Sequence, residues 1–163
     1  MVQLNSVPKG DFSVEEIEAG LWLHDIARSE EESAAIAKAM LSQMGMPSDF
    51  YDNVAGDIAA TKHGQLLFQK PEQRLIADID LSSLATPWQY FVANAILLQK
   101  EFGNQSPSQF FEQTRNLFRV LLTRTSIYGT DFFFSKYEDR AKKNIQTAFA
   151  EMEKNKLPQF WKA

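Results

Sequence analysis

Residues 20–27 read Gly20-Leu21-Trp22-Leu23-His24-Asp25-Ile26-Ala27, and the rest of the chain is expected to fold around this stretch. It is predicted to be helical and is apolar on almost every side, yet it carries two neighbouring ionisable residues. A helix that is apolar all round belongs in a core. An isolated carboxylate in such a place is very costly, so Asp25 must be hydrogen-bonded, paired with a cation or bound to a metal.

The composition is that of a globular protein. The 163 residues are 44% hydrophobic and 23% charged, which is enough for one well-buried core in a single domain. The net charge of −4 gives no reason to expect nucleic acid or a membrane as partner. The chain has no cysteine, which excludes disulfides and thiolate metal sites. With no leader-like start and no apolar run near about 18 residues, the expected location is cytoplasmic.

Capping residues and prolines divide the chain into predicted helices. Ser13, followed by two glutamates, is a typical cap for the first helix, and Ser29 caps the second. The helices are expected at residues 14–28, 30–45, 49–63, 71–81, 87–102, 107–122 and 136–154. Residues 1–12 are predicted to be an irregular lead-in and residues 125–134 a loop with aromatic anchors. The fold class is therefore all-α, a single-domain multi-helix bundle over residues 13–163.

The pair His24 and Asp25 is the first candidate metal site. Neighbouring side chains on a helix diverge by about 100°, which suits a metal beside the helix better than a mutual hydrogen bond. A third ligand must come from another helix. Asp80 shares a face with Ala77, Leu81 and Leu84 and is preferred, whereas Asp78 lies one turn beyond Arg74, a local ion-pair partner, and is the reserve. In the alternative, an arginine or helix N-terminal amides satisfy Asp25.

The other histidine, His63, is predicted in the last turn of the third helix. The helix dipole favours an imidazole there whether or not the residue has a function, so a capping role is the alternative. The glutamates Glu30, Glu31 and Glu32 are interpreted as a solvated first turn, and the alternative is that one of them reaches the mouth of the site.

Four segments together resemble the HD-domain superfamily of metal-dependent phosphohydrolases, and within it a group of small bacterial members. In order, these segments are Trp22-Leu23-His24-Asp25-Ile26, Ser29-Glu30-Glu31-Glu32-Ser33-Ala34, Ala60-Thr61-Lys62-His63 and Ala77-Asp78-Ile79-Asp80-Leu81. Residues 121–130, Glu138-Asp139-Arg140-Ala141 and Asn144 are also similar to that group. The resemblance covers residues 14–155 and implies an HD-like helical bundle.

The resemblance also implies a site and a reaction. His24 and Asp25 match the family's metal-binding pair and Asp80 its final ligand. His63 matches a second histidine that binds a further metal or phosphate, and Lys62 is placed to neutralise phosphate charge. The expected substrate is a small phosphorylated molecule such as a nucleotide. The divalent metal is Mn, Fe, Ni, Co, Zn or, less well, Mg.

One family ligand has no counterpart, because residues 1–23 contain no histidine to match the family's first one. A metal then has three protein ligands, with waters, His63 or a symmetry partner completing the shell. The alternative is a catalytically degenerate binding or interaction module without bound metal. A shortened first helix would uncover apolar surface, so a homodimer is expected.

Overall fold

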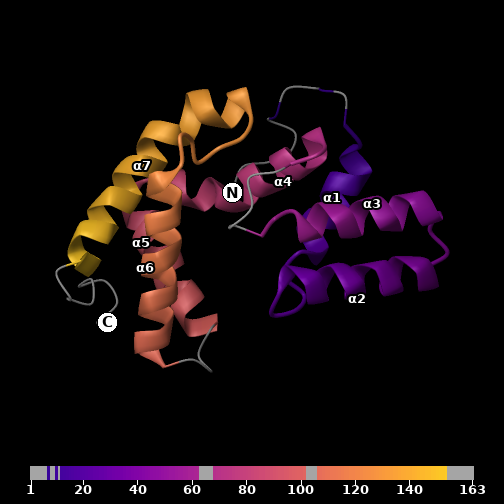
Figure 1. The fold of residues 1–163 in the computed structure, drawn as a ribbon, viewed down its shortest axis with the longest axis horizontal. Helices are drawn as coiled ribbons and strands as arrows, with labels where there is room; N and C mark the ends of the chain where they lie inside the picture. Colours follow the sequence, from indigo (N-terminus) through magenta and orange to yellow (C-terminus); the bar gives the residue numbers. More distant parts are fainter. Residues whose placement is uncertain (1–6, 8–9, 11, 63–67, 102–105, 154–163) are drawn as a thin grey trace. The chain divides into compact units, whose positions relative to one another are not determined.

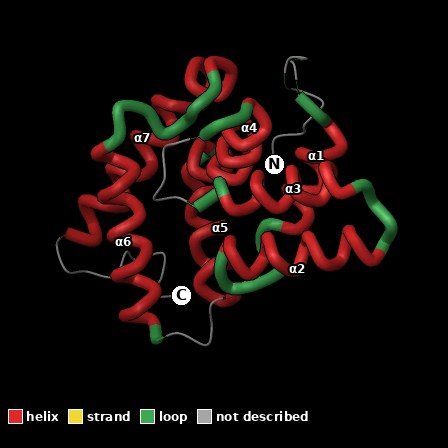
Figure 2. The backbone as a smooth tube through the Cα atoms, turned by 45° about the vertical axis from the view of Figure 1, so that its right-hand side comes forward, coloured by secondary structure: helices red, strands yellow, loops and turns green. Residues whose placement is uncertain are grey.

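A computed structural model describes residues 7, 10, 12–62, 68–101 and 106–153. Within these ranges it contains seven α-helices, one 3-10 helix and no strand, which confirms the predicted all-α class (Figure 2). The helices form two compact units, one that ends at Asp80 and one that begins at Leu81. The predicted lead-in over residues 1–12 falls mostly outside the described residues. None of the described helices combines the length and the apolar character that crossing a membrane requires.

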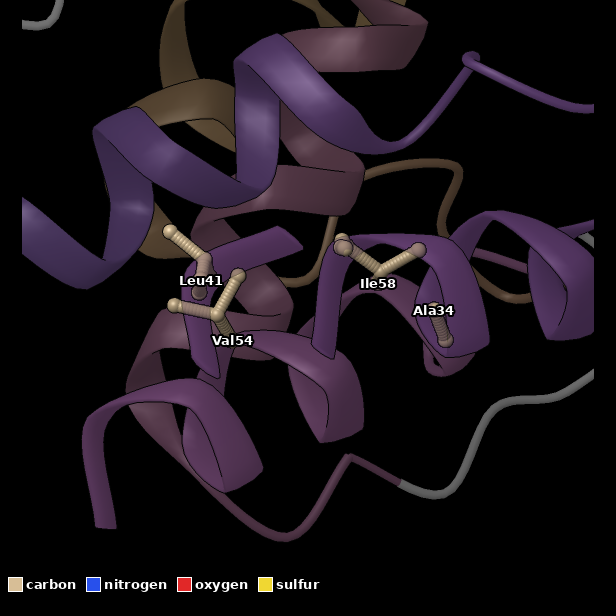
Figure 3. Close-up of a cluster of buried hydrophobic side chains, with 5 residues drawn as sticks. Ala34, Leu41, Val54 and Ile58 are labelled. Atoms are coloured by element: carbon tan, nitrogen blue, oxygen red, sulfur yellow. The ribbon is translucent and has the colours of Figure 1, made fainter. Parts of the chain in front are cut away.

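The N-terminal unit contains four helices and the candidate site. These are α1 (Val14–Leu23), α2 (Glu30–Gln43), α3 (Ser48–Ala59) and α4 (Pro71–Asp80). Helices α2 and α3 lie side by side (Figure 1), and apolar side chains fill the space between them. Figure 3 shows Ala34 and Leu41 from α2 packing with Val54 and Ile58 from α3. Burial of each larger aliphatic side chain contributes about 1.5–3 kcal/mol, so this cluster fixes the helix pair to which α1 and α4 attach.

Local signals set where two of these helices begin. The hydroxyls of Ser13 and Ser29 accept hydrogen bonds from the backbone N–H groups of Glu16 and Glu32, as the sequence predicts for N-caps. At the end of α2, Gly45 has a φ of 78°, a left-handed conformation that glycine adopts without strain. The predicted starts of α1 and α2 are therefore confirmed.

The C-terminal unit contains the 3-10 helix and three long helices. Their bounds are η2 (Leu81–Ala85), α5 (Trp88–Glu101), α6 (Pro107–Thr123) and α7 (Asp131–Glu153). Helix α7 holds η2 through Asn144, whose side-chain amide donates to the carbonyls of Leu84 (2.8 Å) and Thr86 (2.9 Å). The buried hydroxyl of Tyr128 donates to the Leu81 carbonyl over 3.1 Å. Asn144 and Tyr128 thus hold η2 and the residue after it to the rest of this unit.

Three predicted helix bounds are wrong. Helix α1 ends at Leu23 and not at residue 28, α3 ends at Ala59 and not at residue 63, and α7 begins at Asp131 rather than 136. Beyond α1 the chain is bent through residues 26–29, and the Ala27 N–H donates to the Ser33 hydroxyl over 3.1 Å. This bond satisfies a backbone donor outside the helix. The end of α1 therefore leaves His24 and Asp25 at a helix terminus and not inside a helix.

Candidate metal centre

His24 is held at the C-terminal end of α1 by two bonds to its own helix. Its backbone N–H donates to the Gly20 carbonyl (2.9 Å), and its ring Nδ1 lies 2.9 Å from the Leu21 carbonyl oxygen. A carbonyl only accepts, so Nδ1 carries the proton in this contact. In the neutral imidazole the lone pair then belongs to Nε2. A backbone carbonyl that fixes the tautomer in this way is a common support for a histidine that binds metal.

The free ring nitrogen faces two carboxylates. His24 Nε2 lies 3.2 Å from Asp25 Oδ2 and 3.4 Å from Asp80 Oδ1, the latter at the last residue of α4. Neither contact has the alignment of a hydrogen bond, and Nε2 is a buried atom without a hydrogen-bond partner. One ligand atom from each of the three residues lies within 4.8 Å of the others. The N-terminal unit therefore gathers one nitrogen and two carboxylate oxygens around a single point.

These spacings fit a divalent metal. Transition metals bind imidazole nitrogen and carboxylate oxygen at about 2.0–2.2 Å, which places neighbouring ligand atoms of a tetrahedral or octahedral shell about 2.8–3.6 Å apart. Both distances from Nε2 fall in that interval. One imidazole nitrogen and two carboxylate oxygens are also ligands that such metals bind. The residues present thus fit a metal held by one histidine and two aspartates.

The same arrangement favours a proton on His24 when no metal is bound. The Asp25 carboxylate, followed by that of Asp80, raises the pKa of His24 to about 10, although burial acts in the opposite direction. The metal-free site then holds an imidazolium between two carboxylates. A metal must displace this proton to reach Nε2.

Exposure differs among the three residues and corrects one prediction. The side chain of Asp25 is 87% exposed, whereas those of His24 and Asp80 are 15% and 24% exposed. The prediction that Asp25 is enclosed in an apolar helix is therefore wrong, because α1 ends before it. Asp78, the reserve ligand, is 2% exposed and is not in the three-residue cluster. Asp80 is the aspartate of α4 that reaches His24, as the sequence predicts.

Of the two predicted phosphate contacts, the structure describes Lys62. Lys62 pairs with Glu31 over 2.6 Å, and both side chains are about half exposed. The pair raises the pKa of Lys62 and lowers that of Glu31. His63 lies outside the described residues. Lys62 therefore stays a predicted phosphate contact, as the resemblance implies, and its ammonium group is paired with Glu31 in the first turn of α2.

Two features of this unit were missed from the sequence. The Leu21 carbonyl orients His24, and no residue type signals a backbone contact. Asp57 on α3 is fully buried, and a signal for it was available because it shares a face with Val54 and Ile58. An aspartate in the apolar stripe of a helix must be hydrogen-bonded, paired with a cation or protonated, as was expected of Asp25.

Comparison with protein-family models, with curated proteins and with solved structures found no match for this chain.

Proposed function

We propose that this protein is a metal-dependent phosphohydrolase that acts on a small phosphorylated molecule. The observation that supports the proposal is the buried Nε2 of His24, which has no hydrogen-bond partner and lies between the carboxylates of Asp25 and Asp80. The resemblance to the HD-domain superfamily supplies the reaction class. A divalent metal, when bound, would act as a Lewis acid toward phosphate and supply an activated water.

The side chains have distinct roles in this proposal. His24, Asp25 and Asp80 would hold the metal, and the Leu21 carbonyl orients the His24 ring with Nε2 toward the two aspartates. The high exposure of Asp25 leaves the centre accessible from solvent, as a diffusing substrate requires. Lys62 contacts phosphate only after it leaves Glu31, so an anionic substrate and Glu31 compete for the same ammonium group. His63 would contribute a further phosphate or metal contact, as the resemblance implies.

The test is hydrolysis by chelator-treated protein with and without added Mn²⁺. Substrates are a general aryl phosphate and a panel of nucleotides and sugar phosphates. His24→Ala and Asp80→Asn should lower the metal-dependent rate by about 100-fold or more, because each removes a metal ligand. Asp49→Asn is the matched control, since the side chain of that exposed aspartate at the start of α3 accepts a hydrogen bond from Ser48 and is not in the three-residue cluster of the described residues. Hydrolysis that needs no metal, or equal rates in all four proteins, would overturn the proposal.

A second candidate function is a helical binding or interaction module without metal. The observation that favours it is the position of His24 Nε2, 3.2 Å from Asp25 and 3.4 Å from Asp80, because an imidazolium there would form a local ion-pair cluster with both carboxylates. On this reading Asp25→Asn leaves every measured activity unchanged. Equal and negligible metal in the wild type and His24→Ala, together with a rise in melting temperature on adding an apolar ligand, would support the module. Metal identity and a cytoplasmic location stay predictions on either reading.

A further inference from the structure

Asp57 is a buried acid that the proposed metal centre does not use. Its side chain has no exposed surface, and it lies in α3 between the buried residues Val54 and Ile58. Both of its carboxylate oxygens lack a hydrogen-bond partner. An ionised carboxylate without partners in such a place is strongly disfavoured, so Asp57 must carry a proton or acquire a cation.

Polar groups from two other helices and one connection lie close enough to act on the charge of this acid. They are Glu16 on α1, Glu72 and Gln73 on α4, and Lys70 in the segment that precedes α4. The carboxylate of Glu72 accepts the Ser13 backbone N–H over 3.0 Å. The three carboxylates face one lysine, so the group is short of positive charge when all of them are ionised.

That lysine is engaged elsewhere. Asn53, one turn before Asp57 on α3, accepts a hydrogen bond from Lys70 Nζ and donates to Glu16 Oε1 over 2.9 Å. Asn53 therefore links α1 to the segment before α4, while Asp57 remains without a partner. Gln73 also lies near Asp57, but its side-chain oxygen accepts the Gln69 N–H over 2.8 Å.

Burial raises the pKa of Asp57 to about 6, and the negative charges of Glu72 and Glu16 act in the same direction. Lys70 and Gln73 act in the opposite direction without cancelling the effect. The proton that satisfies Asp57 is consequently held loosely enough to leave within the physiological range.

We propose that Asp57 is a proton-binding site of the N-terminal unit, and that loss of its proton transfers Lys70 from Asn53 to the Asp57 carboxylate. The proton passes to water, and the ammonium group stays charged throughout. In the protonated state Asn53 joins Glu16 to Lys70, and in the ionised state an ion pair joins α3 directly to the segment before α4. The start of α4 thus has two polar arrangements whose populations depend on pH. The inference is independent of the metal centre.

The test is the pH titration of the Asp57 side-chain carbon by carbon-detected NMR on the full chain. The signal is assigned through the residue's own β-protons, so no variant is needed, and a chelator keeps metal away from His24. The expected midpoint is near pH 6, about two pH units above the ordinary value for aspartate. A midpoint near pH 4 would overturn the proposal.

Two further experiments test whether Lys70 moves to Asp57 and whether Asp57 binds a proton or a metal cation. Lys70→Met should raise the midpoint, because it removes the cation that stabilises the ionised form. Lys38→Met is the matched control, since Lys38 pairs with Asp52, and should leave the midpoint unchanged. An unchanged midpoint in Lys70→Met would exclude the transfer of Lys70. A midpoint that falls by a unit or more on replacing the chelator with millimolar Mg²⁺ or Ca²⁺ would show that a cation, and not a proton, fills the site.

Discussion

Among single residues, His24 is the one on which the proposed metal site depends. One ring nitrogen is fixed by the Leu21 carbonyl and the other is directed at Asp25 and Asp80. The sequence predicted the members of this group, because a histidine beside an aspartate in an apolar stretch needs a partner. It did not predict the exposure of Asp25, because that depends on where α1 ends. Periodicity continues through Ile26 and gives no stop signal there.

The raised pKa of His24 predicts that metal affinity depends on pH. Below pH 10 the metal-free imidazole is mostly protonated, so metal binding releases one proton. The apparent association constant should therefore rise about tenfold per pH unit between pH 6 and 8. Calorimetric titration of Mn²⁺ in two buffers of different ionisation enthalpy measures both the slope and the proton release. An affinity that does not change over this range would contradict the assignment of Nε2 as a ligand.

At the scale of elements, helix starts were predictable and helix ends were less so. Ser29, Pro71 and Pro107 mark observed starts, because a capping hydroxyl or a fixed proline φ acts over a single turn. The end of α1 instead depends on Ser33, six residues beyond Ala27 in sequence. The early start of α7 had a local signal in Thr130, whose hydroxyl accepts the Phe133 N–H over 3.5 Å. That signal was missed because the aromatic run looked like a loop.

Gly20 sets how closely α1 approaches α4, the two helices that carry the candidate site. A Cβ there would lie 2.7 Å from Cδ1 of the fully buried Ile76. Gly20→Ala gains about 1 kcal/mol of helix propensity, but overpacking costs about 1–3 kcal/mol, so we expect a net loss of stability. In an Ile76→Val background the clashing atom is absent and the same substitution should be neutral or stabilising.

Urea unfolding of the four proteins in this cycle measures the coupling between Gly20 and Ile76. Gly56→Ala is the control, because a Cβ on that glycine meets nothing within 4 Å and should stabilise the protein by about 1 kcal/mol. Equal effects of Gly20→Ala in both backgrounds would show that α4 does not limit the approach of α1.

In the C-terminal unit, Glu138 on α7 holds the connection from α6. Its buried carboxylate accepts the backbone N–H groups of Ile127 (2.9 Å) and Tyr128 (3.2 Å) and pairs with Lys142 over 3.0 Å. Glu138→Ala leaves two buried donors unsatisfied and should destabilise the protein by about 3 kcal/mol in chemical denaturation. Asp139→Ala, at an exposed neighbour, should change stability by less than about 0.5 kcal/mol. Similar effects for both variants would exclude a structural role for this carboxylate.

At the scale of the whole molecule, the candidate site belongs to the unit that ends at Asp80. Residues 24 and 80 were matched from the sequence alone, although 55 residues separate them, because the resemblance kept their order. Asp57 was not singled out because no motif marks it, although it shares a face of α3 with Val54 and Ile58. The sequence was therefore a better guide to which side chains lie together, such as His24 and Asp80, than to how exposed each side chain is.

The homodimer was expected from the shortened first helix, and α5 of the C-terminal unit offers a second apolar surface on which to test it. Large apolar side chains are exposed there, with Tyr90 at 57% and Leu97 at 58%. If this surface associates, light scattering should give twice the chain mass for the wild type and the chain mass for Leu97→Lys. Gln113→Lys, an exposed position on α6, adds the same charge and should stay dimeric. A monodisperse wild-type monomer would contradict the expectation.

Whether His24, Asp25 and Asp80 bind a metal can be measured as the metal content of the 163-residue chain after stripping with chelator, reloading with Mn²⁺ and removing free ion. The account predicts about one ion per chain in the wild type and in Asp49→Asn, and a strong loss in His24→Ala and Asp80→Asn, because each of the latter removes one of three protein ligands. Circular dichroism confirms that each variant remains helical. A wild type that binds no metal, or equal metal content in all four proteins, would show that His24 and Asp80 are not metal ligands.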